Sequence, residues 1–164
     1  MTISDAMPQL WASSLRTTAA GNAAATTQVL DAEKSLDFRI GPECAPARAM
    51  QRATRFAAMV LPALLAEAPD PEAAADTVLQ VHGELVDVTA RHRASLDVAG
   101  RISFDGDHVL ITVEEMDQPL PAPEAEPGLY LVHRLTDDRG QYCGEAGGFT
   151  TWASVPVLRK APQL

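Results

Sequence analysis

Alternating apolar and polar positions in the middle of the chain predict an antiparallel hairpin. Leu96, Val98, Ile102 and Phe104 share one parity along the chain, and Val109, Ile111 and Val113 alternate with other residues after them, a period typical of strands with one buried face. Asp105-Gly106 separates the two stretches and is a common pair in tight hairpin turns. Residues 36–40 alternate in the same way and predict an earlier strand.

Two longer segments show helical spacing instead. The first opens at Pro46 and covers about residues 47–66, with Pro62 predicting a kink or a break near its end. The second covers about 71–93, because Asp70 can cap free backbone N–H groups and a proline fits the first helical position. The apolar stripe expected on the first helix is Ala49, Ala53, Phe56, Val60 and Leu64. The stripe expected on the second is Val78, Val81, Leu85 and Val88.

The last third of the chain completes the predicted architecture. A proline-rich, acidic loop covers residues 119–127, and residues 128–135 fit either a helix or a strand. Residues 139–144 and 149–157 predict two more strands around a turn at Gly147-Gly148. This order predicts an α+β fold, a two-layer sandwich in which a mixed, mostly antiparallel sheet carries helices on one face.

The N-terminal segment lacks such patterns. Residues 1–33 are rich in Ala, Thr and Ser and sustain neither period, so we expect a flexible or partly helical extension. Trp11 and Leu15 are the side chains there that could dock on another surface, or the segment could be a tail without contacts. Residues 34–160 then form the folded domain.

Composition limits the function classes. The chain has 164 residues, 46% of them hydrophobic, which suits one domain with a core. Its net charge of -9 opposes direct binding of nucleic acid, which needs an excess of Lys and Arg. No stretch predicts a signal peptide or membrane span, so a soluble cytoplasmic protein without membrane contact is expected. Cys44 and Cys143 are far apart and are expected to be ordinary thiols.

Five stretches resemble a known family in order and spacing. They are residues 47–57, 83–92, 109–121, 128–132 and 147–153. The stretch 83–92 is similar to a helix of the type Glu-Leu-Val-x-Asn-Ala-x-x-His, and 109–121 is similar to a strand and loop of the type Val-x-Asp-x-Gly-x-Gly-Leu-Pro. The family is that of the histidine-kinase-like (GHKL) ATPases, which share a Bergerat-type fold. The branch is that of the small anti-sigma-factor serine kinases of actinobacterial type.

The resemblance implies a nucleotide site whose key residues are replaced here. The family's Mg²⁺-binding Asn falls at Val88, which offers no oxygen to a hard cation. The Asp that binds the adenine amino group falls at Glu115, one methylene longer. The general base falls at Glu84, which is either a base or a helix-face carboxylate without catalytic role.

The phosphate side of the implied site departs from the family as well. Two glycines are replaced by Asp117 and Pro119, and Pro119 has no backbone N–H to offer. Of the motif Gly-x-Gly-Leu only Gly128 remains with its leucine, and Glu124 and Glu126 add negative charge where a polyanion would bind. These departures act together against nucleotide binding and against kinase chemistry.

We therefore expect a non-catalytic regulatory module that keeps the ATPase-like scaffold and has no catalytic residue, no cofactor and no metal site. Its expected partner is a protein of transcription regulation: a sigma factor, an antagonist or a DNA-binding regulator. One alternative is a weak ATP-binding serine kinase that uses Glu84, Glu115 and Gly128. Another is a module that binds a different small ligand in the same region.

A basic stripe on the first predicted helix is the candidate partner surface. Arg48, Arg52 and Arg55 recur at helical spacing in a chain of strongly negative charge. The stripe could dock an acidic partner or support a homodimer through the acidic loop of a second copy. It could also be an ordinary solvated helix face.

Overall fold

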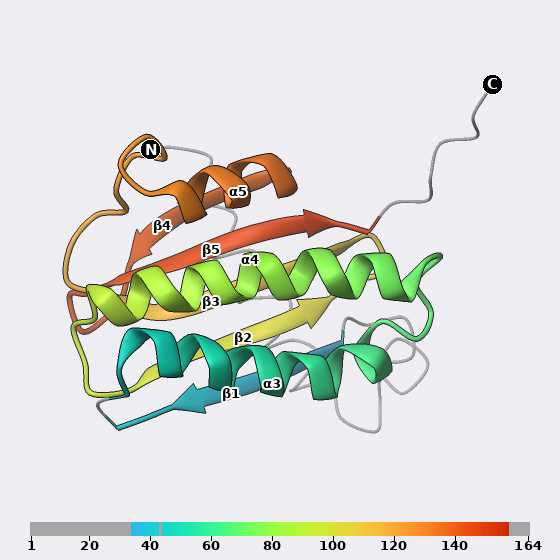
Figure 1. The fold of residues 1–164 in the computed structure, drawn as a ribbon, viewed down its shortest axis with the longest axis horizontal. Helices are drawn as coiled ribbons and strands as arrows, with labels where there is room; N and C mark the ends of the chain where they lie inside the picture. Colours follow the sequence, from blue (N-terminus) through green and yellow to red (C-terminus); the bar gives the residue numbers. More distant parts are fainter. Residues whose placement is uncertain (1–33, 43, 158–164) are drawn as a thin grey trace.

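The computed structural model describes residues 34–42 and 44–157, and Figure 1 shows their arrangement. The predicted extension, residues 1–33, and the last residues of the predicted domain lie outside the described part. The strands are β1 (Lys34–Ile40), β2 (Val98–Phe104), β3 (His108–Met116), β4 (Asp138–Cys143) and β5 (Phe149–Pro156). The helices described are α3 (Pro46–Leu64), α4 (Pro71–Arg91) and α5 (Pro127–Leu135).

The five strands form one sheet in the order β1-β2-β3-β5-β4, and all its pairings are antiparallel. The predicted hairpin is confirmed as β2 and β3. At its turn, the Oδ1 atom of Asp105 accepts the N–H groups of Asp107 and His108. Gly106 has a φ of 104°, a conformation that residues with a Cβ rarely adopt, which explains why the turn requires glycine.

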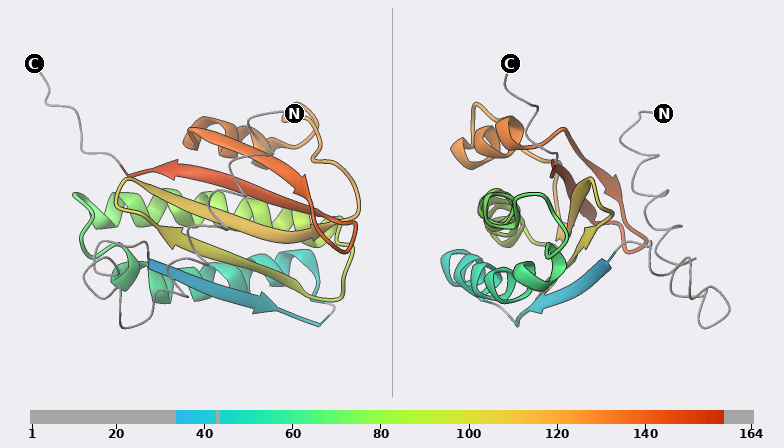
Figure 2. Two further views of the ribbon diagram at one scale, coloured as in Figure 1. Left: turned by 180° about the vertical axis from the view of Figure 1, so that it is seen from behind. Right: turned by 90° about the vertical axis from the view of Figure 1, so that its right-hand side faces the viewer.

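The three described helices lie together on one face of the sheet, as Figure 2 shows in its right-hand view. The predicted two-layer α+β sandwich is therefore confirmed. Helix α4 begins as its sequence predicts, because the Asp70 side chain accepts the N–H of Ala73 at 3.2 Å and Pro71 follows the cap. Residues 128–135, which fit either structure by pattern, belong to a helix that begins at Pro127.

Helix α3 continues through Pro62 and ends at Leu64. The expected break does not occur at Pro62, and the helix ends two residues after it. Proline removes one backbone donor, and near the C-terminus of a helix this loss affects only the final turn. The exposed position of Pro62 also keeps its ring out of the core.

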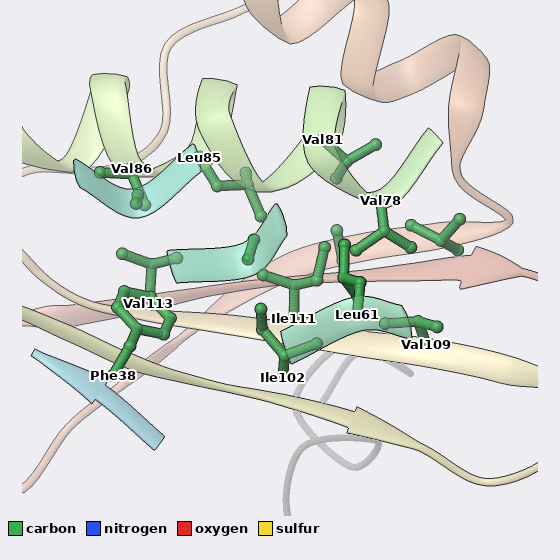
Figure 3. Packing of buried hydrophobic residues seen from close by; sticks show 14 of the residues in the cluster. Phe38, Leu61, Val78, Val81, Leu85, Val86, Ile102, Val109, Ile111 and Val113 are labelled. Atoms are coloured by element: carbon green, nitrogen blue, oxygen red, sulfur yellow. The ribbon is translucent and has the colours of Figure 1, made fainter. Parts of the chain in front are cut away.

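The main hydrophobic core fills the space between the sheet and helices α3 and α4, and Figure 3 shows its packing. Val78, Val81 and Leu85 of α4 are buried there, which confirms the stripe predicted for that helix. The sheet supplies the facing side chains from its central strands. They are Ile102, Val109, Ile111 and Val113.

The stripe predicted for α3 is confirmed at Ala49, Ala53 and Leu64 and is wrong at Phe56 and Val60. The buried residues there are Ala57 and Leu61, whereas Phe56 and Val60 are only partly buried. Four-residue steps from Ala49 keep the small side chains in line with the core, and Phe56 lies at its margin. The Phe56 ring contacts that of Phe38 on β1, with centroids 5.9 Å apart.

Small side chains bring α3 and α4 close together. Ala49, Ala53 and Ala57 are completely buried on α3. Gly83 of α4 is buried opposite the same helix, and a Cβ built there would lie 3.2 Å from the Cε atom of Met50. The interface is therefore tightly packed at its centre.

One polar side chain, His82 of α4, is enclosed in this core. It is 0% exposed and stacks edge-on against Phe38, with ring centroids 4.7 Å apart. Neither ring nitrogen has a hydrogen-bond partner. Burial lowers the pKa of His82 from 6.5 to about 4, because a charged ring would lose its hydration. The imidazole is therefore neutral at physiological pH.

Candidate functional site

The residues singled out by the resemblance come from the C-terminal half of α4, the end of β3, the following loop and the start of α5. Helix α4 packs beside both α5 and β3. This arrangement brings Glu84 and Val88 next to residues that are more than 25 positions away in the sequence. The region therefore forms one site that can be compared, residue by residue, with the expected chemistry.

Val88 lies in a second apolar cluster, separate from the main core. Its side chain is 1% exposed and is buried with Met116 of β3 and Leu129 of α5. Leu120 and Phe149 pack against this cluster from the loop and from β5. The position where the family carries a metal ligand is thus enclosed by hydrocarbon and thioether groups, which do not bind Mg²⁺.

Glu84 lies one turn earlier on α4 and contacts the start of α5. A Cβ built at Gly128 would collide with the Oε2 atom of Glu84, so the glycine leaves room for this carboxylate. Burial raises the pKa of the Glu84 carboxyl, and nearby Asp87 and Glu126 raise it further, whereas Arg91 lowers it. The structure therefore brings two predicted site residues, Glu84 and Gly128, into contact.

An ion pair that the sequence analysis missed ties α4 to α5. Arg91 Nη1 and Nη2 donate to the two carboxylate oxygens of Glu126 at 2.8 and 2.9 Å. The Arg91 Nε also donates to Asp87 at 3.1 Å, one turn back on α4. Arg91 holds the pKa of the Glu126 carboxyl below its usual range. Glu126 is the cap residue of α5, so this fork fixes where the acidic loop ends.

A second residue missed from the sequence, Gln141 of β4, holds the beginning of the loop. Its Oε1 accepts the N–H of Leu120 at 2.6 Å. Its Nε2 donates to the Oγ1 of Thr151 at 3.1 Å and to the sulfur of Met116 at 3.4 Å. The loop is thus fastened at both ends, by Gln141 near its start and by Arg91 at its end.

The remaining predicted site residues point elsewhere or face solvent. Glu115 lies where the pairing of β3 with β5 shifts register, and its carboxylate packs against Gly148 in the turn between β4 and β5. Asp117 and Pro119 are exposed in the loop. The backbone of this segment is bonded beyond the C-terminal end of α4, where the N–H of Asp117 donates to the carbonyl of His92.

The chemistry available at this site is limited. Glu84, Asp87 and Glu126 place three carboxylates around the single guanidinium of Arg91. Among the described residues, no group of three or more His, Cys, Asp or Glu side chains is arranged to hold a metal ion. The local charge is negative, which opposes the approach of phosphate groups.

The basic stripe lies away from this region, on α3. Arg48, Arg52 and Arg55 are all exposed, and within the described part of the chain none of them forms an ion pair. The next residue along the same stripe is Met59, whose side chain is 76% exposed. The stripe thus combines unpaired positive charge with an exposed apolar side chain.

Comparisons with known proteins add no family to these observations. No protein-family model matches the sequence, and no curated protein matches it. None of the helices in the described part of the chain is long and apolar enough to span a membrane.

Proposed function

We propose that this protein is a non-catalytic regulatory module on a scaffold similar to the histidine-kinase-like ATPases. Its partner is a protein of transcription regulation: a sigma factor, an antagonist or a DNA-binding regulator. It works in the cytoplasm, without cofactor and without direct contact to nucleic acid. One observation carries the proposal: Val88, at the position of the family's metal ligand, is buried between Met116 and Leu129.

Three further features support the loss of nucleotide chemistry. Arg91 is the cation that acts on Glu84 in the described part of the chain, and it is already paired with Glu126. Its guanidinium is therefore not free to bind a phosphate group. The loop that follows β3 carries acids and prolines where backbone N–H groups would be needed. Glu115 packs against Gly148. With catalysis removed, contact with another chain is the activity left to the scaffold.

Isothermal titration with ATP and Mg²⁺ tests the loss of nucleotide binding. We expect no binding tighter than about 1 mM, equivalent to about -4 kcal/mol. A radiolabelled phosphoryl-transfer assay with added sigma-factor antagonist should give no product above background. Micromolar binding of ATP would contradict the proposal.

The alternative, a weak serine kinase, rests on one specific observation. Glu84 keeps the position of the family's general base, contacts Gly128, and has a raised pKa, as a residue that accepts and returns a proton would. In that case Glu84→Gln abolishes phosphoryl transfer without weakening partner binding. If the protein is a non-catalytic interaction module, Glu84→Gln should change neither phosphoryl transfer nor partner binding.

The partner surface is proposed to be the basic stripe of α3. We expect the pair Arg48→Glu with Arg52→Glu to weaken the complex that the tagged protein forms in its native cell, since the pair reverses the charge that an acidic partner would recognise. Arg134→Glu, on the exposed side of α5, is the matched control and should leave the complex intact. Equal recovery of the partner with the stripe pair and with the control would exclude this surface.

Added salt supplies a second test of the same surface. Exposed charges interact over only about 8 Å at physiological ionic strength, so a contact built on the stripe should weaken as salt increases. Size-exclusion chromatography with light scattering at low and high salt also tests the proposed homodimer. A complex that is insensitive to salt would contradict recognition by the arginines.

A further inference from the structure

The face of the sheet that points away from the helices carries a buried patch. Side chains alternate along each strand, so Leu110 and Trp152 point away from the core that holds Ile111 and Ala153. Leu110 is 2% exposed and Trp152 is 0% exposed. Their buried neighbours on the same face complete what we call the outer-face patch. It consists of Ser103, Leu110, Thr150, Trp152 and Ser154.

No element in the described part of the chain covers this patch. The three described helices all pack on the opposite face, as both views in Figure 2 show. An indole and a leucine on a bare sheet would be substantially exposed. The Nε1 of Trp152 and the Oγ of Ser103 are also buried without a hydrogen-bond partner. Both groups can donate a hydrogen bond, and on a sheet face open to solvent water would accept it.

We propose that the N-terminal extension of this same chain, residues 1–33, docks on the outer-face patch through Leu10, Trp11 and Leu15. These side chains form the most apolar group in the first half of the extension. The extension also carries hydroxyl and amide groups and its own backbone carbonyls, which are acceptors for the Trp152 indole and the Ser103 hydroxyl.

The place where the extension joins the domain favours this occupant. Residue 33 precedes Lys34, which lies opposite Phe104, and that row continues across the sheet through Val109 to Val155. From β1 to β5 the row spans three strand spacings, about 14 Å. A segment of 33 residues can extend to about 100 Å, so it reaches Trp152 easily.

The other end of the chain fits less well. Residues 158–164 include Arg159, Lys160 and Pro162. Only Leu158 and Leu164 among them are large and apolar. Two leucines beside two cations offer less apolar surface for an indole and a leucine than Leu10, Trp11 and Leu15 do.

The shape of the buried area also favours a segment over a second copy. The patch is confined to β2, β3 and β5, whereas Ser35, Asp37 and Arg39 remain exposed on the same face of β1. A stable dimer through this face would bury about 800 Å² on each copy and would be expected to include β1. A narrow strip of buried residues matches the width of one polypeptide segment.

Tryptophan fluorescence tests the proposal, because the chain has only two tryptophans. The full-length variant Trp11→Phe leaves Trp152 as the only indole and should show blue-shifted emission with little acrylamide quenching. Adding Leu10→Asp and Leu15→Asp should release the extension. We expect emission to shift to longer wavelength and the quenching constant to rise at least threefold.

The matched control carries the same charges at neighbouring polar positions. Gln9→Asp with Ser14→Asp, in the Trp11→Phe background, should leave the emission of Trp152 unchanged. If the leucine pair and the control give the same protected spectrum while circular dichroism shows both folded, the proposal is wrong. It is also wrong if Trp152 is already open to acrylamide in the Trp11→Phe protein.

A spin label decides the matter even if the leucine pair fails to fold. The label is attached at Ser14→Cys in a full-length protein that also carries Cys44→Ser and Cys143→Ser. It should broaden the NMR signals of the Trp152 indole and the Leu110 amide. Absence of broadening would overturn the proposal. Broadening in a mixture of spin-labelled protein and separate ¹⁵N-labelled protein would mean that a second copy supplies the cover, and would also overturn it.

Discussion

The buried histidine of α4 predicts a specific loss of stability at mildly acidic pH. The folded protein lowers the pKa of His82 to about 4, whereas the unfolded chain keeps the ordinary value of 6.5. Above pH 6.5 both states are neutral at this position, and the stability is fully present. As the pH falls from 6.5 towards 4, His82 binds a proton in the unfolded chain but not in the folded protein. The free energy of unfolding therefore decreases.

The magnitude follows from the difference between the two pKa values. Each unit corresponds to about 1.4 kcal/mol, so the complete effect is about 3 kcal/mol. Between pH 7 and pH 5, before most carboxylates titrate, the contribution of His82 should be about 2 kcal/mol. This is a substantial part of the 5–15 kcal/mol by which a typical domain is stable.

Equilibrium unfolding in urea, followed by circular dichroism at pH 7 and pH 5, measures this contribution. His82→Leu keeps an apolar group of similar size beside Phe38 and should remove about 2 kcal/mol of the pH dependence. The variant His133→Leu also removes one histidine, but at an exposed position of α5, and should retain the full dependence. If His82→Leu and the unmodified protein lose the same free energy between pH 7 and pH 5, then His82 is not enclosed as described.

Three further predictions concern the candidate site. Val88→Asn should lower the free energy of unfolding by about 1–3 kcal/mol, because an amide would lose its water in an apolar cluster; an unchanged urea midpoint would mean that position 88 is open to solvent. Arg91→Met should raise the pKa of Glu126, measured by NMR titration of its carboxyl carbon, because the guanidinium now lowers it; an unaltered titration would show that the ion pair does not persist in solution. Gln141→Leu should speed hydrogen exchange at the Leu120 amide by about fivefold, since a hydrogen bond contributes about 1 kcal/mol; equal exchange in both proteins would contradict this contact.

The elements that the sequence predicts well are those whose signals are local. The Asp105-Gly106 turn and the Asp70 cap each depend on residues within four positions of one another, and both occur as predicted. The stripe of α3 depends on which side chains meet the sheet, and this is decided by tertiary contacts. Phe56 is more hydrophobic than Ala57, yet the smaller residue is the one that allows the helix to approach the core.

The features of the candidate site also divide into those that the local sequence predicts and those that depend on tertiary contacts. The burial of Val88 could be read from its place in the apolar stripe of α4. The Arg91–Glu126 fork joins residues 35 positions apart, and nothing in the sequence near either residue specifies the pairing. Gln141 looked like one polar position in an alternating strand, and its role as the acceptor for Leu120 depends on how the loop folds back over β4.

The close contact between α3 and α4 constrains how this sequence can diverge. Ala49, Ala53 and Ala57 are completely buried, and in a close-packed core a larger side chain at any of them requires a smaller neighbour or a shift of the helix. Gly83 is more permissive, because the atom it would meet is the flexible end of Met50. We therefore expect covariation between positions 50 and 83 in related sequences. The three alanines should change least, because few other residue types are compatible with this fold at those positions.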